Sequence, residues 1–265
     1  MARTVNFSRL SASSVTGRLL RKPLNLIPTS AVLPVLQGPL RGTRWITGSA
    51  SHGCWLGSYE YSKQLAFAKA VHSADVVYDV GANVGFYTLL ASRLVGRQGR
   101  VYSFEPFPNN IAVLNRHLRL NDVTNATVFE AAVADKPGHM RFAQGELHQE
   151  GRLSETGSIK VRVVSLDDLV LSGLAQPPQL MKIDVEGAEL QVLHGAAMIL
   201  REYKPVIFLA THGKAVHRDC CELLRSYGYF LFSLTQEDVD NTEEIRAVPA
   251  REPAPNESEA PAPRD

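Results

Sequence analysis

The chain has 265 residues, of which 45% are hydrophobic and 21% charged, and its formal net charge is +1. This composition excludes wholesale disorder, because it supplies enough apolar surface for a core. The charge gives no reason to expect nucleic acid as a partner. No apolar run reaches the roughly 18 residues of a membrane-spanning helix, so we expect no transmembrane segment. Three cysteines cannot form a disulfide framework, which indicates a reducing, cytoplasmic location.

Positive charge is concentrated near the start of the sequence. The first acidic residue is Glu60, and residues 1–39 are rich in Ser, Arg and Pro. We expect a basic, flexible arm over 1–39, where contact with an acidic partner or a membrane surface is to be sought. An organellar transit peptide is the alternative interpretation. The seven basic residues that precede Glu60 are Arg3, Arg9, Arg18, Arg21, Lys22, Arg41 and Arg44.

Strands and helices then alternate along the chain. Short apolar runs predict buried strands, and longer stretches with apolar residues on one face predict helices. This alternation is typical of an α/β fold, a doubly wound and mostly parallel sheet. The expected strands are Val76–Val80, Arg100–Phe104, Thr127–Val133, Leu180–Ile183, Val206–Leu209 and Tyr229–Leu234, with shorter segments at His139–Phe142 and Ile159–Val164. The expected helices are Phe86–Val95, Asn109–Leu120, Glu186–Arg201 and Ala215–Ser226.

These elements predict one domain over residues 40–247. Within it, 40–74 precede the first core strand and are expected to form a lid or pocket segment. Residues 248–265 are rich in Pro, Ala and Glu and contain almost no large apolar side chain. Such a tail cannot bury enough surface to offset its ordering entropy, so we expect it to be disordered.

A glycine-rich turn follows the first core strand. Asp79 is the last residue but one of that strand, and Gly81, Asn83 and Gly85 follow at alternate positions before a helix. Gly81 allows a tight turn, and Gly85 allows close approach of a ligand or another element. Glu105 ends the next strand, 20 residues after Gly85, where a carboxylate can accept both ribose hydroxyls of an adenosine. The pattern predicts an adenosine-containing cofactor.

Two cofactor classes fit this layout. A dinucleotide site has the spacing G-x-G-x-x-G, so that a helix N-terminus can hold the pyrophosphate, whereas here Asn83 stands between Gly81 and Gly85. Asp79 is also a poor neighbour for a pyrophosphate and suits a cationic ligand. The charges therefore favour S-adenosylmethionine, which carries a sulfonium and an ammonium group and no phosphate. A glycine-rich turn without any ligand is the remaining alternative.

Acidic residues and a histidine follow the next two core strands. Asp184 and Glu186 come after Leu180–Ile183, and His212 comes after Val206–Leu209. In open α/β sheets ligands bind at this edge. One carboxylate could simply cap a helix; beyond that, either could hold the cofactor's ammonium group, orient a substrate hydroxyl or help bind a divalent cation. His212 is a candidate general base.

A third group of polar and aromatic residues lies just before the core. His52 and Cys54 offer too few ligands at suitable spacing for a metal centre, and the sequence assigns no metal site. Trp55 and Tyr59 either cover the pocket or pack in the core.

Four segments together resemble the FkbM family of S-adenosylmethionine-dependent methyltransferases. In chain order they are DVGANVGFYTLLAS, FEPFPNNIAVLNRHLRLN, VVSLDDL and LMKIDVEGAELQVLHGA. The resemblance runs from about Leu40 to Leu234. It implies a class I methyltransferase fold, a Rossmann-like sheet of seven mostly parallel strands with the last strand reversed. The seventh strand is then either Glu244–Val248 or one of the accessory segments.

The resemblance also assigns roles to individual positions. Asp184, Glu186 and Gly187 match the family's D-x-E-G-x-E signature. With His212, the two acids are the catalytic candidates. Family members often carry an acidic residue shortly before this His, whereas here Ala210 and Thr211 precede it. The predicted cofactor-binding residues are Asp79, Gly81, Asn83, Gly85, Glu105, Ala132, Val133 and Asp184.

Motifs and charges therefore both indicate methyl transfer. We expect O-methylation of a hydroxyl on a sugar, a glycan or a small metabolite, because a catalytic base is useful for such an acceptor. The alternatives are a nicotinamide-dependent oxidoreductase and a non-catalytic scaffold with a methyltransferase-like fold.

Overall fold

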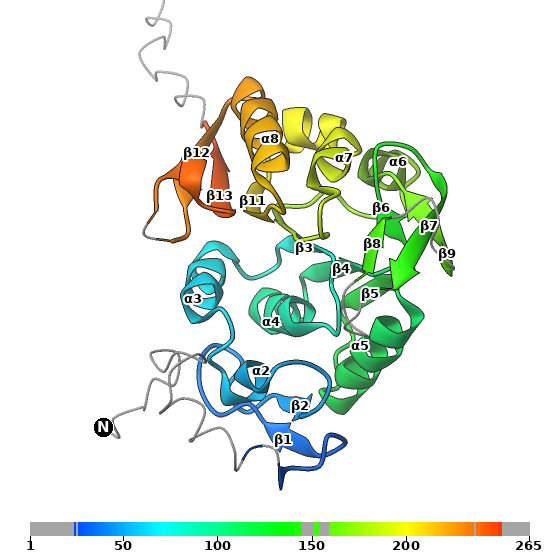
Figure 1. Ribbon diagram of the computed structural model, residues 1–265, viewed down its shortest axis with the longest axis vertical. Coiled ribbons are helices and arrows are strands. Elements are labelled where there is room, and N and C mark those ends of the chain that lie inside the picture. Colours follow the sequence, from blue (N-terminus) through cyan, green and yellow to red (C-terminus); the bar gives the residue numbers. More distant parts are fainter. Residues whose placement is uncertain (1–23, 25, 145–150, 154–158, 236, 251–265) are drawn as a thin grey trace, which may run out of the picture.

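We analysed a computed structural model of the chain, which describes residues 24, 26–144, 151–153, 159–235 and 237–250 (Figure 1). The predicted arm falls largely, and the predicted tail almost wholly, outside these described residues. Within them, no helix is long and apolar enough to cross a membrane.

A seven-stranded sheet forms the centre of the molecule. Its order is β12-β13-β11-β10-β3-β4-β5, and β13 runs antiparallel to both of its neighbours while the other pairs are parallel. The predicted seventh strand is therefore β13, inserted between β11 and β12. The strands are β3 (Val76–Val80), β4 (Arg100–Phe104), β5 (Ala126–Phe129), β10 (Leu180–Ile183), β11 (Val206–Ala210), β12 (Tyr229–Ser233) and β13 (Glu244–Pro249).

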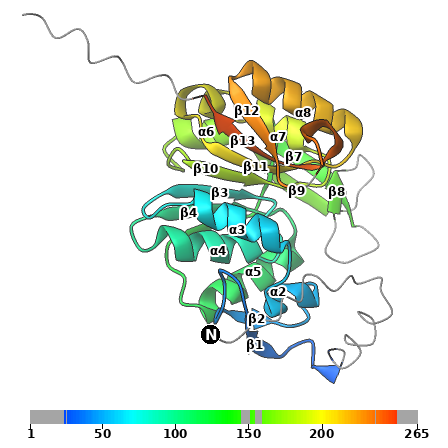
Figure 2. The same cartoon turned by 90° about the vertical axis from the view of Figure 1, so that its left-hand side faces the viewer.

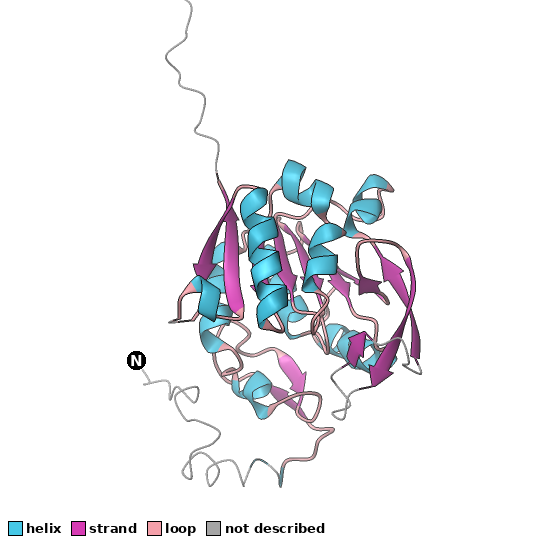
Figure 3. Cartoon of the chain, turned by 45° about the horizontal axis from the view of Figure 1, so that its top comes forward, coloured by secondary structure: helices cyan, strands magenta, loops and turns pink. Residues whose placement is uncertain are grey.

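Helices cover both faces of this sheet (Figures 1, 2 and 3). Successive strand residues point to opposite faces, so Val77 and Phe208 join one apolar cluster while Tyr78 and Ile207 join another. These two clusters form the core. The helices of the first face are α3 (Tyr61–Ala70), α4 (Phe86–Val95) and α5 (Pro108–Leu120). Those of the second are α6 (Leu166–Leu171), α7 (Glu189–His194) and α8 (Lys214–Ser226).

A smaller sheet lies beyond β5, at the right-hand side of Figure 1. The predicted strand Thr127–Val133 is in fact two strands, because the chain bends at Glu130 and Ala131 and leaves the central sheet. Its second part pairs in parallel with β9. The smaller sheet has the order β6-β9-β7-β8 and consists of β6 (Ala132–Val133), β7 (Gly138–Gln144), β8 (Gly151–Leu153) and β9 (Ile159–Val164).

The segment before α3 packs under α4 and α5. It contains the paired strands β1 (Val32–Pro34) and β2 (Arg44–Ile46) and the short helix α2 (His52–Leu56). Trp45 is fully buried and stacks on the His117 ring with centroids 4.1 Å apart. Val35 is also buried, so residues 32–39 belong to the folded unit. The sequence prediction extended the flexible arm too far, because it weighed the prolines above the apolar residues between them.

The predicted helix over Glu186–Arg201 also differs from the structure. Glu186 and Gly187 have φ of +57° and +105°, which a right-handed helix does not allow, so α7 begins only at Glu189. It ends at His194, and a π-helical turn follows at Ile199–Tyr203. The left-handed turn at Glu186 and Gly187 keeps Glu186 beside the sheet edge, near Asp184.

A 3₁₀ turn, Val239–Asn241, precedes β13.

Candidate active site

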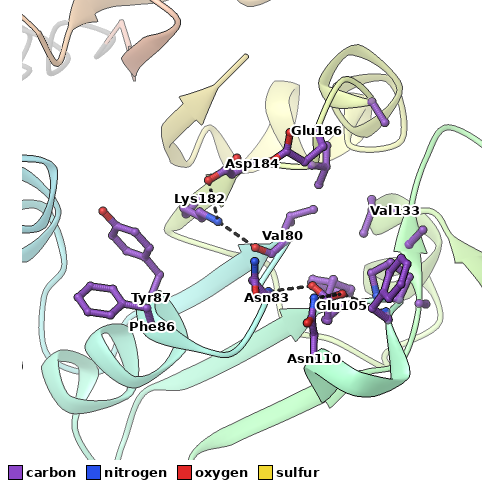
Figure 4. A pocket seen from close by; sticks show the side chains of 18 of the residues that line it. Val80, Asn83, Phe86, Tyr87, Glu105, Asn110, Val133, Lys182, Asp184 and Glu186 are labelled. Carbon is purple, nitrogen blue, oxygen red and sulfur yellow. Dashed lines mark hydrogen bonds and ion pairs between the residues drawn. The ribbon is translucent and has the colours of Figure 1, made fainter. Parts of the chain in front are cut away.

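A cavity that is open to solvent lies at the carboxyl ends of β3, β4 and β10 (Figure 4). Most of the predicted site residues line it. The exceptions are Asp79, Gly85 and His212, which do not contribute to its wall. The lining residues that the sequence predicted are Gly81, Asn83, Glu105, Ala132, Val133, Asp184 and Glu186.

The glycine-rich turn forms the floor of the cavity. Gly81 has φ of +78°, and a Cβ there would collide with the carbonyl oxygen of Asp184. Glycine therefore lets the ends of β3 and β10 meet. Gly85 is needed for helix packing, since a Cβ there would lie 3.0 Å from Leu114 Cγ. It brings α4 close to α5 and shapes the pocket without lining it.

The N–H groups of this turn already have acceptors inside the protein. Those of Gly81 and Ala82 both donate to the Phe104 carbonyl at 3.0 Å. The Asn83 N–H donates to Glu105 Oε2 at 2.8 Å, and the Gly85 N–H donates to the Ala82 carbonyl at 2.8 Å. A phosphate at a helix N-terminus is normally held by such backbone donors. These four donors are engaged elsewhere, so the turn is not arranged as a pyrophosphate cradle.

Glu105 is held from three sides. Besides Asn83, the Phe107 N–H donates to its Oε1 at 2.9 Å, and Asn110 Nδ2 donates to the same atom at 3.2 Å. The side chain is 5% exposed, and this burial raises the pKa of Glu105 despite the donors around it. The carboxylate is thus fixed in orientation while it faces the cavity (Figure 4).

Lys182 lies between two carboxylates under the cavity. Its Nζ is 3.6 Å from Asp79 Oδ1 and 3.5 Å from Asp184 Oδ2, and it donates to the Gly81 carbonyl at 3.0 Å. Burial by itself lowers the pKa of Lys182, but the charges of Asp184 and Asp79 outweigh burial and raise it. The lysine therefore stays charged. Lys182 therefore joins the ends of β3 and β10 through one carboxylate on each side.

Asp79 is buried behind the cavity wall. Thr88 Oγ1 donates to its Oδ2 at 2.6 Å, and its side chain is 1% exposed. Burial raises the pKa of Asp79, and Lys182 and Thr88 act against that shift. In this position Asp79 reaches the cavity only through Lys182 and the turn that Lys182 holds.

His212 lies among three carboxylates at the sheet edge. Its Nε2 is 3.4 Å from Glu186 Oε2 and 3.8 Å from Asp184 Oδ1, and its Nδ1 is 2.8 Å from Glu189 Oε1. The hydrogen bond to Glu189 raises the pKa of His212, partly offset by burial. Glu189 has no side-chain exposure. The acid in contact with His212 Nδ1 therefore comes from the start of α7.

Aromatic side chains from α4 and the preceding segment close one wall of the cavity. Tyr59, Phe86 and Tyr87 line it, and Tyr87 donates its hydroxyl to Glu60 Oε2 at 2.8 Å. Tyr59 thus takes the pocket position that the sequence left open. The His52 ring, by contrast, accepts a hydrogen bond from Trp55 Nε1 at 3.1 Å, and neither residue lines the cavity.

Several residues of the site were not predicted, among them Asn110, Tyr87 and Glu189. Asn110 lies in the first turn of α5, and its pairing with Glu105 has no signature in a single sequence. Tyr87 reads as an ordinary core residue of α4. Glu189 did carry a signal, as the third acid of the Asp184–Glu189 run, but its pairing with His212 depends on how α7 meets β11.

The strand order, with one reversed strand, is that of class I methyltransferases. The family model for the methyltransferase FkbM domain matches residues 79–231. The chain therefore belongs to the FkbM methyltransferase family. The match covers all the predicted site residues.

Two curated proteins and one solved structure illustrate the relationship. The hexuronic acid methyltransferase AglP of Haloferax volcanii is 30% identical over 154 residues, which are 57% of this chain and 61% of that protein. Methyltransferase 1 of Beauveria bassiana is 25% identical over 147 residues, 45% of this chain and 57% of that protein. A crystal structure of an FkbM methyltransferase from Methylobacillus flagellatus has a TM-score of 0.50 at 18% identity, covering 75% of this chain and 55% of that one. It supports the fold. The chain spans about three fifths of the length of these curated relatives.

Proposed function

We propose that this protein transfers a methyl group from S-adenosylmethionine to a hydroxyl group. The observation that carries the choice of cofactor is the state of the glycine-rich turn, where the N–H groups of Gly81, Ala82, Asn83 and Gly85 all have internal acceptors. A dinucleotide would need such donors for its pyrophosphate. The cavity instead offers carboxylates, which suit a ligand with a sulfonium and an ammonium group. The relatives reported above are all methyltransferases and give no support to an oxidoreductase.

The cofactor would lie along the floor of the cavity. Glu105 is placed to accept the ribose hydroxyls, with its orientation fixed by Asn83 and Asn110. Ala132 and Val133, at the start of the smaller sheet, would border the adenine. At the opposite end of the cavity, Asp184 would face the amino-acid portion of the cofactor. Asp79 and Gly85 do not line the cavity and would act indirectly, by shaping the glycine-rich turn.

The acceptor is a hydroxyl on a sugar, a glycan or a small metabolite. In the reaction the acceptor oxygen forms a bond to the methyl carbon while the carbon–sulfur bond breaks, and its electron pair stays on the sulfur. The hydroxyl proton must also leave, and we propose that Asp184 and Glu186 at the cavity edge, or His212 beside them, assist its removal. One relative is a hexuronic acid methyltransferase, which supports a sugar as the first acceptor class to test.

Calorimetric titration with S-adenosylhomocysteine and, separately, with NADH tests the cofactor. We expect the first to bind and the second not to. Binding of NADH alone would overturn the proposal. A screen with isotope-labelled cofactor and uronic acids, neutral sugars and small phenols would then identify the acceptor, and absence of transfer with binding intact would favour the non-catalytic scaffold.

We also propose a cytoplasmic location. The three cysteines are free and buried, which fits a reducing compartment. The basic residues of the first 23 positions stay a proposed contact for an acidic partner or a membrane surface.

A further inference from the structure

The side chains at the ends of β10 and β11 are arranged like a set of metal ligands. One ligand atom from each of Asp184, Glu186 and His212 can be chosen so that all three lie within 4.8 Å of one another. Asp184 and Glu186 project side by side at the edge of the cavity (Figure 4). Their side chains are 23% and 36% exposed, and that of His212 is 31% exposed. An ion could therefore reach the cluster from the cavity.

The fourth residue, Glu189, fixes the histidine ring. Its Oε1 is 2.8 Å from His212 Nδ1 and also accepts the Gly187 N–H at 3.0 Å. A carboxylate can only accept a hydrogen bond, so Nδ1 carries the hydrogen and Nε2 is directed toward Asp184 and Glu186. Metal-bound histidines almost always have such a carboxylate or carbonyl on the second nitrogen, and it holds the ring in the coordinating orientation. This arrangement points to a ligand beyond a simple acidic cluster.

Charge at the cluster is unbalanced toward the negative. Asp184, Glu186 and Glu189 surround one imidazole ring. Glu189 Oε2 is buried and has no hydrogen-bond partner among the residues that the structure describes. Lys182 is 3.5 Å from Asp184, but it is shared with Asp79 and held by the Gly81 carbonyl. A divalent cation would supply the missing positive charge.

The spacing of the ligand atoms agrees with such an ion. Ligands about 2.1 Å from a metal are about 3.0 Å apart at neighbouring octahedral positions and about 3.4 Å apart in a tetrahedral site. The His212 Nε2 atom is 3.4 Å from Glu186 and 3.8 Å from Asp184. All three atoms lie within 4.8 Å of one another, so the two partly exposed carboxylates would turn toward the ion when it binds.

We propose that Asp184, Glu186 and His212 bind a divalent cation of the Mn²⁺ or Mg²⁺ class, with Glu189 as the positioning residue behind His212. Carboxylate ligands favour these ions, and two of the three ligands here are carboxylates. The remaining coordination positions would face the cavity. Resting on the proposed function, the ion would bind the acceptor hydroxyl there and make its proton easier to lose. The cluster would then activate the hydroxyl by coordination, because the ion occupies Nε2.

Mn²⁺ titration of the metal-stripped full chain, followed by electron paramagnetic resonance, tests this site. We expect one bound Mn²⁺ per chain and, in spin-echo spectra, modulation from a histidine nitrogen that is absent in His212→Ala. Glu189→Gln should weaken binding by about 10- to 100-fold, as loss of an outer-shell partner does. Glu186→Gln and His212→Ala should weaken it at least as much. The exposed residues Glu222 and His139 provide matched controls, and Glu222→Gln and His139→Ala should bind Mn²⁺ like the wild type.

Absence of bound Mn²⁺, or equal binding by the wild type and the three cluster variants, would overturn the proposal. Thermal unfolding in chelator shows whether each variant is folded, and the partly exposed Glu186 and His212 keep the test valid if Glu189→Gln fails to fold. A titration with S-adenosylhomocysteine in the same chelator tests the proposed function separately. Cofactor binding without metal binding would remove only the cation site.

Discussion

The two ends of the cavity hold their carboxylates in different ways. At one end Glu105 is held by two backbone N–H groups and an amide, all within 22 residues of it in sequence. At the other end Asp184 and Glu186 face Lys182 and His212, whose charges can be replaced by those of a ligand. Backbone donors fix an acceptor rigidly, whereas ionic partners can exchange. The end at Glu105, the rigid end, is therefore suited to a constant part of the cofactor. The end at Asp184 and Glu186, the exchangeable end, is suited to reacting groups.

The largest effect is expected at the exchangeable end. His212→Ala should lower the turnover of methyl transfer by about 100-fold to 10,000-fold, the range for lost help with a proton transfer, because it removes either the base or a ligand of the proposed cation. The affinity for S-adenosylhomocysteine should stay unchanged, because His212 does not line the cofactor cavity. Steady-state kinetics together with calorimetry would check both, and His139→Ala is the control. Undiminished turnover would remove His212 from the mechanism.

The second largest effect is expected on the stability of the fold, at the buried Asp79–Lys182 ion pair. Asp79→Asn removes one of the two carboxylates around Lys182. Removal of one partner from a buried pair typically costs about 3 kcal/mol or more of unfolding free energy. The affinity for S-adenosylhomocysteine should fall less than in a Glu105 variant, because Asp79 acts only through Lys182 and Gly81. Urea unfolding and calorimetry measure the two quantities. A severe loss of affinity with normal stability would mean that Asp79 contacts the cofactor directly.

The same contrast explains how much the sequence could predict. Elements with strong periodicity, such as β3, α4 and α5, lie within one residue of their predicted bounds, because local pattern and core position agree there. The rim acids were also identified, since strand ends meet at one edge of a parallel sheet. The predictions that were wrong concern the start of α7 and the strand over Thr127–Val133, and both depend on tertiary structure. The start of α7 depends on left-handed residues at Glu186 and Gly187, and β6 leaves the central sheet at a bend that composition does not indicate.

Partnerships across elements were harder to predict than positions. Glu105 lines the cavity, but its contact with Asn110 depends on the angle at which α5 follows β4. His212 was identified without its partner Glu189, because the two are 23 residues apart and meet only where α7 packs beside the end of β11. A single sequence carries no record of which side chains meet across a sheet edge.

The rigid end gives the third prediction. Glu105→Gln keeps the size of the side chain but removes the charge. It also replaces one carboxylate oxygen by an NH₂ group, which is a donor and cannot accept from the N–H groups around it. Hydrogen bonds to charged groups contribute about 1.5–3 kcal/mol, so the affinity for S-adenosylhomocysteine should fall by roughly 10- to 100-fold. Calorimetry measures this, with Glu222→Gln as the control. Unchanged affinity would show that the ribose lies elsewhere.

The smallest effect concerns the wall that joins the N-terminal segment to the exchangeable end. Tyr87 donates to Glu60, which is 3.3 Å from Lys63, and Lys63 in turn is 3.1 Å from Glu244 on β13. Tyr87→Phe keeps the ring in the wall and removes only the hydroxyl. We expect a loss of about 1 kcal/mol in unfolding free energy, the usual net contribution of one hydrogen bond.

A double-mutant cycle with Glu60→Gln isolates this contact. If the hydroxyl acts through Glu60, the two changes should be non-additive by about 0.5 kcal/mol or more in urea unfolding. Additive losses would separate Tyr87 from the ionic network. The affinity for S-adenosylhomocysteine should be nearly constant across the cycle, because Glu60 and the Tyr87 hydroxyl pair with each other and Glu105 is held by other donors. A large change in affinity would instead extend the rigid end of the cavity into the N-terminal segment.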